Sequence, residues 1–130
     1  MTLRCLVAVL MLSAVPAAGH HSFASEYDAS KPVTLTGVVT RLDWLNPHIW
    51  LYLNVKDATG TTANWAVSGS PPGFLLRRGL TREAIRPGTA IRIDGFRARD
   101  GSDNACGSTI TLGDGRRFVM SGNGVNEKRP

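Results

Sequence analysis

The sequence predicts a mainly β domain with five or six strands and one short helix between the third and fourth strands. Several short runs alternate apolar and polar residues and are separated by turn residues, which is typical of half-buried strands. One segment, which begins with prolines and ends with a glycine, instead has the signals of a short helix. The chain has 130 residues, of which 42% are hydrophobic, and this is enough for one domain with a core.

The first half of the domain contains the strongest strand signal. Here Ile49, Leu51 and Leu53 alternate with polar or aromatic residues, so one face of this strand is expected in the core. In the preceding strand, Gly37 interrupts the alternation and predicts a bulge or bend. The first three strands are expected at 33–42, 48–57 and 61–68.

The segment after the third strand carries helix signals. Ser70 is placed to cap a helix, Pro72 fits its first turn, and Gly79 follows its end. Thr81 is placed to cap a second short turn, which ends before Pro87. One short helical region is therefore expected between the third and fourth strands.

The last third of the domain returns to strand patterns. A fourth strand is expected at 89–99, with a bulge at Gly95, and a final hairpin at 106–112 and 116–120. Five strands with a helix between the third and fourth form the chain order of OB-fold barrels. We therefore expect an OB-like β-barrel over residues 33–120. A generic five- or six-stranded sandwich is the alternative.

The first nineteen residues have the three parts of a secretory signal peptide. Arg4 precedes about ten apolar residues, and small residues follow. The apolar run is shorter than the roughly 20 residues that span a bilayer, so we expect cleavage and no membrane anchor. The cut is expected after Gly19, with Ala17 and Ala24 as alternatives. The protein is then periplasmic, with an N-terminal arm at 20–32 and a flexible tail at 121–130.

Processing changes the composition. The full chain has 15 Lys and Arg and 10 Asp and Glu, a net charge of +5, and removal of Arg4 leaves +4. This charge is moderate, and an exported protein meets little nucleic acid, so we expect no nucleic-acid partner. Removal of the leader also leaves Cys106 as the single cysteine, which excludes an internal disulfide.

Several motifs together resemble a family of short exported bacterial proteins that is classed as a domain of unknown function. The resemblance covers nearly all of the expected mature chain and is carried by an HHSF N-terminus, a WxNPHxW motif and shorter matches. It implies secretion and an OB-like barrel, but it supplies no reaction, ligand or catalytic residue. The matching segments are HHSFA (20–24), EYD (26–28), KPV (31–33), WLNPHIW (44–50), NW (64–65), LLRRG (75–79) and PG (87–88).

The three histidines suggest a metal site. Cleavage after Gly19 gives His20 a free α-amino group beside its ring nitrogen, and His21 or His48 can add a further imidazole. Such nitrogen sets suit Cu(II), which accepts planar geometry and binds tightly. The leading functional hypothesis is therefore a binding module for a transition metal, most plausibly copper. The alternative is that His20 and His21 belong to a polar arm and His48 bonds the backbone.

A second candidate site is aromatic. Trp50 and Tyr52 share the polar face of the second strand, and Trp44 lies just before it, whereas Trp65 is expected in the core. Strands two and three form the ligand face of many OB folds, so these rings are candidates to bind a small molecule or a protein partner. Packing beneath the N-terminal arm is the other reading. The chain has none of the common enzyme motifs, so an enzyme is the less favoured class.

Overall fold

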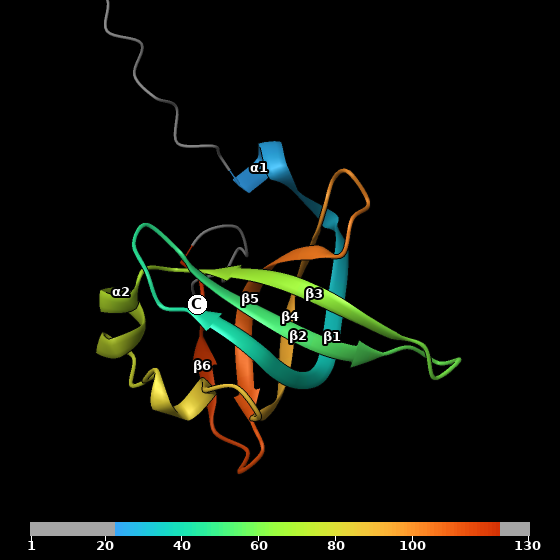
Figure 1. Ribbon diagram of the computed structural model, residues 1–130. Coiled ribbons are helices and arrows are strands. Elements are labelled where there is room, and N and C mark those ends of the chain that lie inside the picture. Colours follow the sequence, from blue (N-terminus) through green and yellow to red (C-terminus); the bar gives the residue numbers. More distant parts are fainter. Residues whose placement is uncertain (1–22, 123–130) are drawn as a thin grey trace, which may run out of the picture.

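The computed structural model describes residues 23–122 of the chain, and Figure 1 shows a small β-barrel with short helices at its ends. The predicted signal peptide, His20, His21 and most of the predicted tail lie outside the described residues. The elements in order are α1 (Phe23–Glu26), β1 (Tyr27–Asp43), β2 (Ile49–Lys56), β3 (Thr62–Gly69), α2 (Pro72–Arg77), the 3-10 helix η1 (Glu83–Ile85), β4 (Ala90–Ala98), β5 (Asn104–Leu112) and β6 (Arg117–Val119).

The strands form one six-stranded sheet that closes on itself. Its order is β3-β2-β1-β4-β5-β6, and β3 also pairs in parallel with β5 over 66–68 and 104–106. The closed ring is therefore β1-β2-β3-β5-β4, with α2 and η1 between β3 and β4. This arrangement confirms the predicted mainly β, OB-like barrel. Closure also pairs strand edges that would otherwise be exposed.

The alternation predicted for the second strand is present in β2 and shows which face of this strand lines the core. On β2, Ile49, Leu51 and Leu53 are fully buried, and the residues between them face outward. Residues from every side of the ring complete the core, together with Leu75 and Ile85 from the two helices outside it. The helices therefore cover the end of the barrel at which these apolar side chains would otherwise meet water.

Two glycines in strands allow close backbone approach. A Cβ atom at Gly37 would collide with the carbonyl oxygen of Asn54, and one at Gly95 with the carbonyl oxygen of Cys106. The predicted bulge at Gly95 is present as a register shift between Asp94 and Gly95. The sequence predicted a bulge or bend at Gly37, and the bulge is wrong, since the register shift lies between Val39 and Arg41. Gly37 instead pairs with both β2 and β4, where the long β1 is shared by both neighbours.

The helix between β3 and β4 ends as expected but begins differently. Gly79 has a φ of 85°, and Leu80 N donates to Leu75 O, which forms a left-handed helix end. The predicted capping by Ser70 is wrong. Pro71 is the N-cap residue, and no side chain caps the helix. Ser70 lies one residue earlier, where its N–H donates to Met120 O at 2.8 Å.

The N-terminal part of the domain is more regular than the predicted arm at 20–32. Residues 23–26 form α1, and β1 begins at Tyr27, six residues before the expected start at 33. Tyr27 pairs with Ala98 and Pro32 with Phe96, with an irregularity between the two pairs. Polar composition and Pro32 suggested a loop, but pairing with the outer end of β4 holds this segment as strand.

Candidate functional site

A row of outward-facing side chains runs across four neighbouring strands of the barrel beneath α1. Trp50 on β2 pairs with Ser68 on β3, Ser68 with Cys106 on β5, and Cys106 with Phe96 on β4. Paired residues project from the same face of a sheet, so these four side chains are neighbours. Ser68 is nevertheless only 7% exposed, which means that another part of the chain covers it.

The covering segment is α1 with the start of β1. The Phe23 ring stacks on Tyr27 at 5.7 Å between centroids and meets the Phe96 ring edge-on at 5.8 Å. The Tyr27 hydroxyl and Ser68 Oγ are 3.0 Å apart in a buried hydrogen bond. Arg99 also holds the segment in place, because its Nε donates a hydrogen bond to Ala24 O at 2.6 Å. The N-terminal segment is thus fixed by aromatic packing and by hydrogen bonds.

Tyr27→Phe tests how strongly this attachment stabilises the domain. Loss of the hydroxyl is expected to lower the free energy of unfolding by about 1 kcal/mol, the usual value of a hydrogen bond between neutral groups. Tyr52→Phe is the matched control, since the Tyr52 ring is half-buried and packs beneath Arg41. Denaturant titration measures both, and equal losses in the two variants would contradict the attachment.

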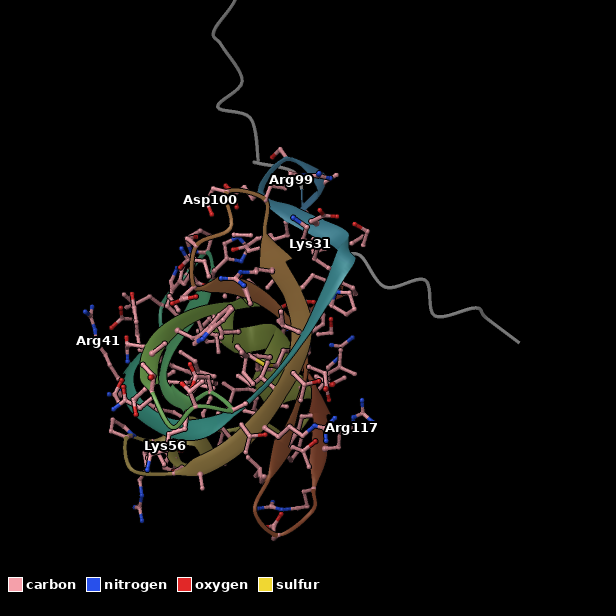
Figure 2. The ribbon with its side chains drawn as sticks, turned by 90° about the vertical axis from the view of Figure 1, so that its right-hand side faces the viewer. Lys31, Arg41, Lys56, Arg99, Asp100 and Arg117 are labelled. Atoms are coloured by element: carbon pink, nitrogen blue, oxygen red, sulfur yellow. The ribbon has the colours of Figure 1, made fainter. Side chains whose placement is uncertain are left out.

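A cavity of 410 Å³ opens between this segment, β2 and the loop from β4 to β5. Trp50 is its aromatic wall, and the polar groups come from α1, from the loop and from the start of β5. Figure 2 shows Arg99 and Asp100 at the α1 end of the barrel, away from Arg41 and Lys56. The lining consists of Ser25, Glu26, Tyr27, Trp50, Ala98, Arg99, Asp100 and Asn104.

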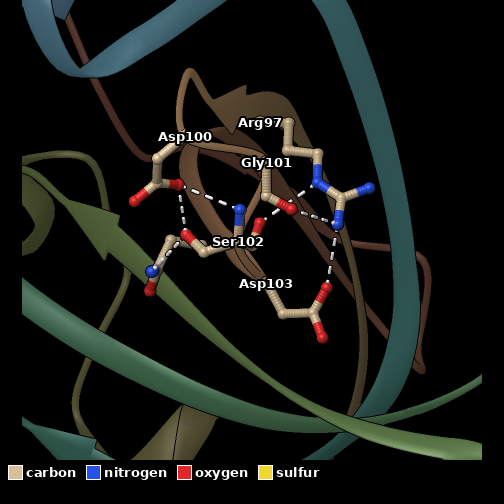
Figure 3. A network of polar contacts seen from close by, with 6 residues as sticks. Arg97, Asp100, Gly101, Ser102 and Asp103 are labelled. Carbon is tan, nitrogen blue, oxygen red and sulfur yellow. Dashed lines mark hydrogen bonds and ion pairs between the residues drawn. The ribbon is translucent and has the colours of Figure 1, made fainter.

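The loop at the cavity is held by a polar network (Figure 3). Asp100 Oδ1 accepts hydrogen bonds from Ser102 N at 2.9 Å and from Ser102 Oγ at 2.5 Å, and Asn104 Nδ2 donates to Ser102 Oγ at 2.8 Å. The hydrogen bonds from Ser102 hold the pKa of Asp100 below its ordinary value. The carboxylate is therefore ionised at neutral pH and oriented before any ligand arrives.

Arg97 supports the same loop from its other side. Its Nε donates to Ser102 O at 3.1 Å, and its Nη2 donates to Gly101 O at 2.8 Å and to Asp103 Oδ1 at 3.0 Å. The guanidinium also lies 5.0 Å from the centroid of the Trp65 ring, a residue that belongs to the core, as predicted. The loop is thus anchored to the barrel rather than only to itself.

The three predicted aromatic site residues lie in different surroundings. Trp50 lines the cavity. Tyr52, two residues further along β2, instead packs beneath Arg41 at 4.9 Å. Trp44 is partly buried against the core. Of the predicted aromatic face, only Trp50 therefore reaches the cavity.

Of the three predicted metal ligands, only His48 lies among the described residues. His48 is exposed just before β2, and its Nδ1 lies 3.2 Å from Gly69 O. A carbonyl oxygen can only accept, so Nδ1 carries a proton, and in the neutral ring the free lone pair is then on Nε2. His20 and His21 lie outside the described residues. Within 23–122, no three His, Cys, Asp or Glu residues are grouped to hold a metal ion.

Cys106 is a covered thiol beside the cavity. Burial raises the pKa of its thiol above the ordinary value, and the Ser68 and Ser121 hydroxyls lower it only in part. Since the thiolate is the reactive form, modification by Ellman's reagent at pH 8 should be slower in the folded protein than in denaturant. Tyr27→Ala is expected to speed the reaction by uncovering the row. Equal rates in folded and denatured protein would show that the thiol is not covered.

Sequence patterns missed most of the cavity. Glu26, Arg99, Asp100 and Asn104 stand in polar segments whose composition is that of ordinary turns and arms. The one usable signal was Trp50, a large aromatic residue on the polar face of the clearest strand. The others are brought to it only by barrel closure between β3 and β5 and by the pairing of Tyr27 with Ala98.

Comparisons with known proteins give a family match but no activity. No helix in residues 23–122 is long and apolar enough to cross a membrane. A comparison with curated proteins and one with solved structures each found no match. A family model described as a family of unknown function, DUF6152, matches residues 8–108, which is more than half of the chain. The chain therefore belongs to the DUF6152 family of proteins of unknown function.

Proposed function

We propose that this protein is an exported, periplasmic binding module that takes a small molecule in the cavity beside Trp50. The observation that carries the proposal is the cavity itself: 410 Å³, with one indole wall and convergent polar side chains. Small-molecule sites usually occupy about 300–1,000 Å³ and combine apolar walls with a few oriented polar groups. The loop between β4 and β5 and the N-terminal segment supply such polar groups. Because hydrogen bonds already hold both segments, their side chains lose little conformational entropy when a ligand binds.

The position of the cavity on the barrel also favours binding. It lies at the outer face of β2, where Trp50 projects, and is bordered by the loop from β4 to β5. OB folds commonly bind ligands on the face of strands two and three, between the loops from strand one to two and from four to five. This likeness is one between folds, so the residues of the cavity carry the proposal.

A compound panel observed by NMR tests this proposal. The mature ¹⁵N-labelled protein is titrated with saccharides, organic cations, carboxylic acids and aromatic acids. The expected result is that at least one compound shifts signals of Trp50, Asp100 and Asn104 together, while signals of Tyr52 and Lys56 stay in place. Shifts that fall only outside the cavity lining would refute the proposed site.

Export to the periplasm is the second part of the proposal and has its own test. The leader signals at residues 1–19 motivate it, and the family match begins at residue 8, inside the apolar run. Expression of the full chain in a Gram-negative host should give a periplasmic product. Its intact mass should correspond to cleavage after Gly19, Ala17 or Ala24. A cytoplasmic product with an uncut leader would contradict export.

A second candidate function is Cu(II) binding through the processed N-terminus. The observation in its favour is the state of His48, whose Nδ1–H bonds Gly69 O and whose exposed ring keeps Nε2 for a metal. His20 or His21 would supply the other nitrogens. Electron paramagnetic resonance of the processed protein should then show nitrogen-bound Cu(II), with the signal weakened in His48→Ala. One extra N-terminal Met should abolish binding through the α-amine, and an unchanged spectrum would exclude that ligand.

A further inference from the structure

We infer that the cavity beside Trp50 recognises a neutral carbohydrate, a mono- or disaccharide. This inference rests on the proposed binding function and names the ligand class for the same site. Its basis is the combination of one flat apolar wall with polar groups of both hydrogen-bonding types. A sugar ring has the matching surface, because its C–H groups form an apolar face and its hydroxyls surround that face.

The indole of Trp50 supplies the apolar wall. Trp50 is half-buried, and it faces away from the core between the buried Ile49 and Leu51. The ring is partly exposed to solvent beside the cavity. Burial of an apolar ligand surface against its face is therefore favourable, because both surfaces are removed from water. Neither Tyr52 nor Trp44 adds a second, opposing ring, since they lie beneath Arg41 and against the core. Tyr27 also lines the cavity, but it is only 8% exposed and its ring stacks on Phe23. One stacking face suits a sugar better than a base held between two rings.

The polar groups offer acceptors and donors side by side. The carboxylate of Asp100 is an acceptor, and Ser102 fixes its direction. The amide of Asn104 is oriented because its Nδ2 donates to Ser102 Oγ, so its carbonyl oxygen lies on the opposite side of the amide. The guanidinium of Arg99 is a donor, held by its bond to Ala24 O. Each sugar hydroxyl both donates and accepts, so neighbouring hydroxyls can use both kinds of group.

The charges of the lining disfavour an anion. Glu26 and Asp100 are acidic, and Arg99 is basic, so the cavity has charges of both signs. An anion would face two carboxylates, whereas a cation could use the carboxylates but would leave the N–H donors of Arg99 without an acceptor. The hydrogen bonds that a neutral polyol makes to charged groups are stronger than bonds between neutral partners, which compensates for the loss of water from the cavity.

The test compares ligand classes on the mature protein, by the shift of the Trp50 indole signal and of the Asn104 side-chain amide. The probes are glucose, galactose, N-acetylglucosamine, maltose and cellobiose, with choline and spermidine as organic cations and citrate as an anion. We expect at least one saccharide to shift both signals. In Asp100→Asn, which keeps the side-chain shape, the same saccharide should bind about tenfold more weakly. Asp114→Asn should bind as the wild type, because Asp114 lies in the hairpin between β5 and β6, pairs with Arg116 and does not line the cavity.

Three results would overturn the inference. If choline, spermidine or citrate shifts the cavity signals and no saccharide does, the cavity binds a ligand of another class, and the proposed function stands without the carbohydrate. If a saccharide binds equally well to wild type and to Asp100→Asn, the polar groups do not recognise it. If no probe shifts the Trp50 signal, the inference fails, and the proposed function fails with it when the aromatic acids of the wider panel also leave this signal in place.

Discussion

Gly37→Ala is expected to lower the free energy of unfolding by about 3 kcal/mol, near the upper end of the usual cost of overpacking. The physical reason is that a Cβ atom at this position would collide with the carbonyl oxygen of Asn54, which is backbone and cannot rotate away. Gly37 also pairs with both Val55 and Ile91, so a shift of β1 disturbs two strand pairs at once. Denaturant unfolding followed by circular dichroism measures the loss.

Thr36→Ala is the matched control for this substitution. Thr36 is the preceding residue on the same strand, and its side chain is exposed. Its replacement is expected to change stability by less than about 0.5 kcal/mol, as is usual for surface positions. If the two variants were equally stable, the close approach of β1 and β2 at Gly37 would not be a requirement of the fold.

Leu51→Ala is expected to lower the free energy of unfolding by about 2–5 kcal/mol, the range for truncation of a fully buried leucine. Leu51 has no exposed surface and lies in the middle of β2, so its loss leaves a void that the closed barrel cannot collapse to fill. Chemical denaturation measures this change as well.

Val38→Ala is the control for the core substitution, because Val38 is 43% exposed on the outside of β1. It should cost a small fraction of the loss in Leu51→Ala. A comparable loss in both variants would contradict the division of the strands into a buried and an outward face.

The fold was largely predictable from the sequence because its strands alternate clearly. Ile49, Leu51 and Leu53 mark the buried face of β2, and Gly79 marks the end of the helix. The order of elements then restricts the topology to few choices. The start of the domain was not predictable in this way. Residues 27–32 are polar and contain Pro32, and only pairing with β4, far along the chain, makes them strand.

The candidate site was predictable only at Trp50. Residues on one strand keep their alternation, so a tryptophan on the polar face of β2 was a visible signal. Its polar companions come from α1 and from the loop between β4 and β5, which are distant in sequence. Tyr52 carries the same signal as Trp50 but faces Arg41 instead, because the cavity extends over only one end of the strand. Local patterns do not show which of two aromatic neighbours a distant loop will reach.

Calorimetry on two variants of β2 tests whether the cavity beside Trp50 is the binding site. The ligand is whichever panel compound binds the mature protein most tightly. Trp50→Ala removes the aromatic wall and is expected to weaken binding by about tenfold or more, whereas Tyr52→Ala, on the same face outside the cavity, should bind within about twofold of the wild type. If Trp50→Ala binds as tightly as the wild type, or if Tyr52→Ala loses the affinity instead, the cavity is not the site.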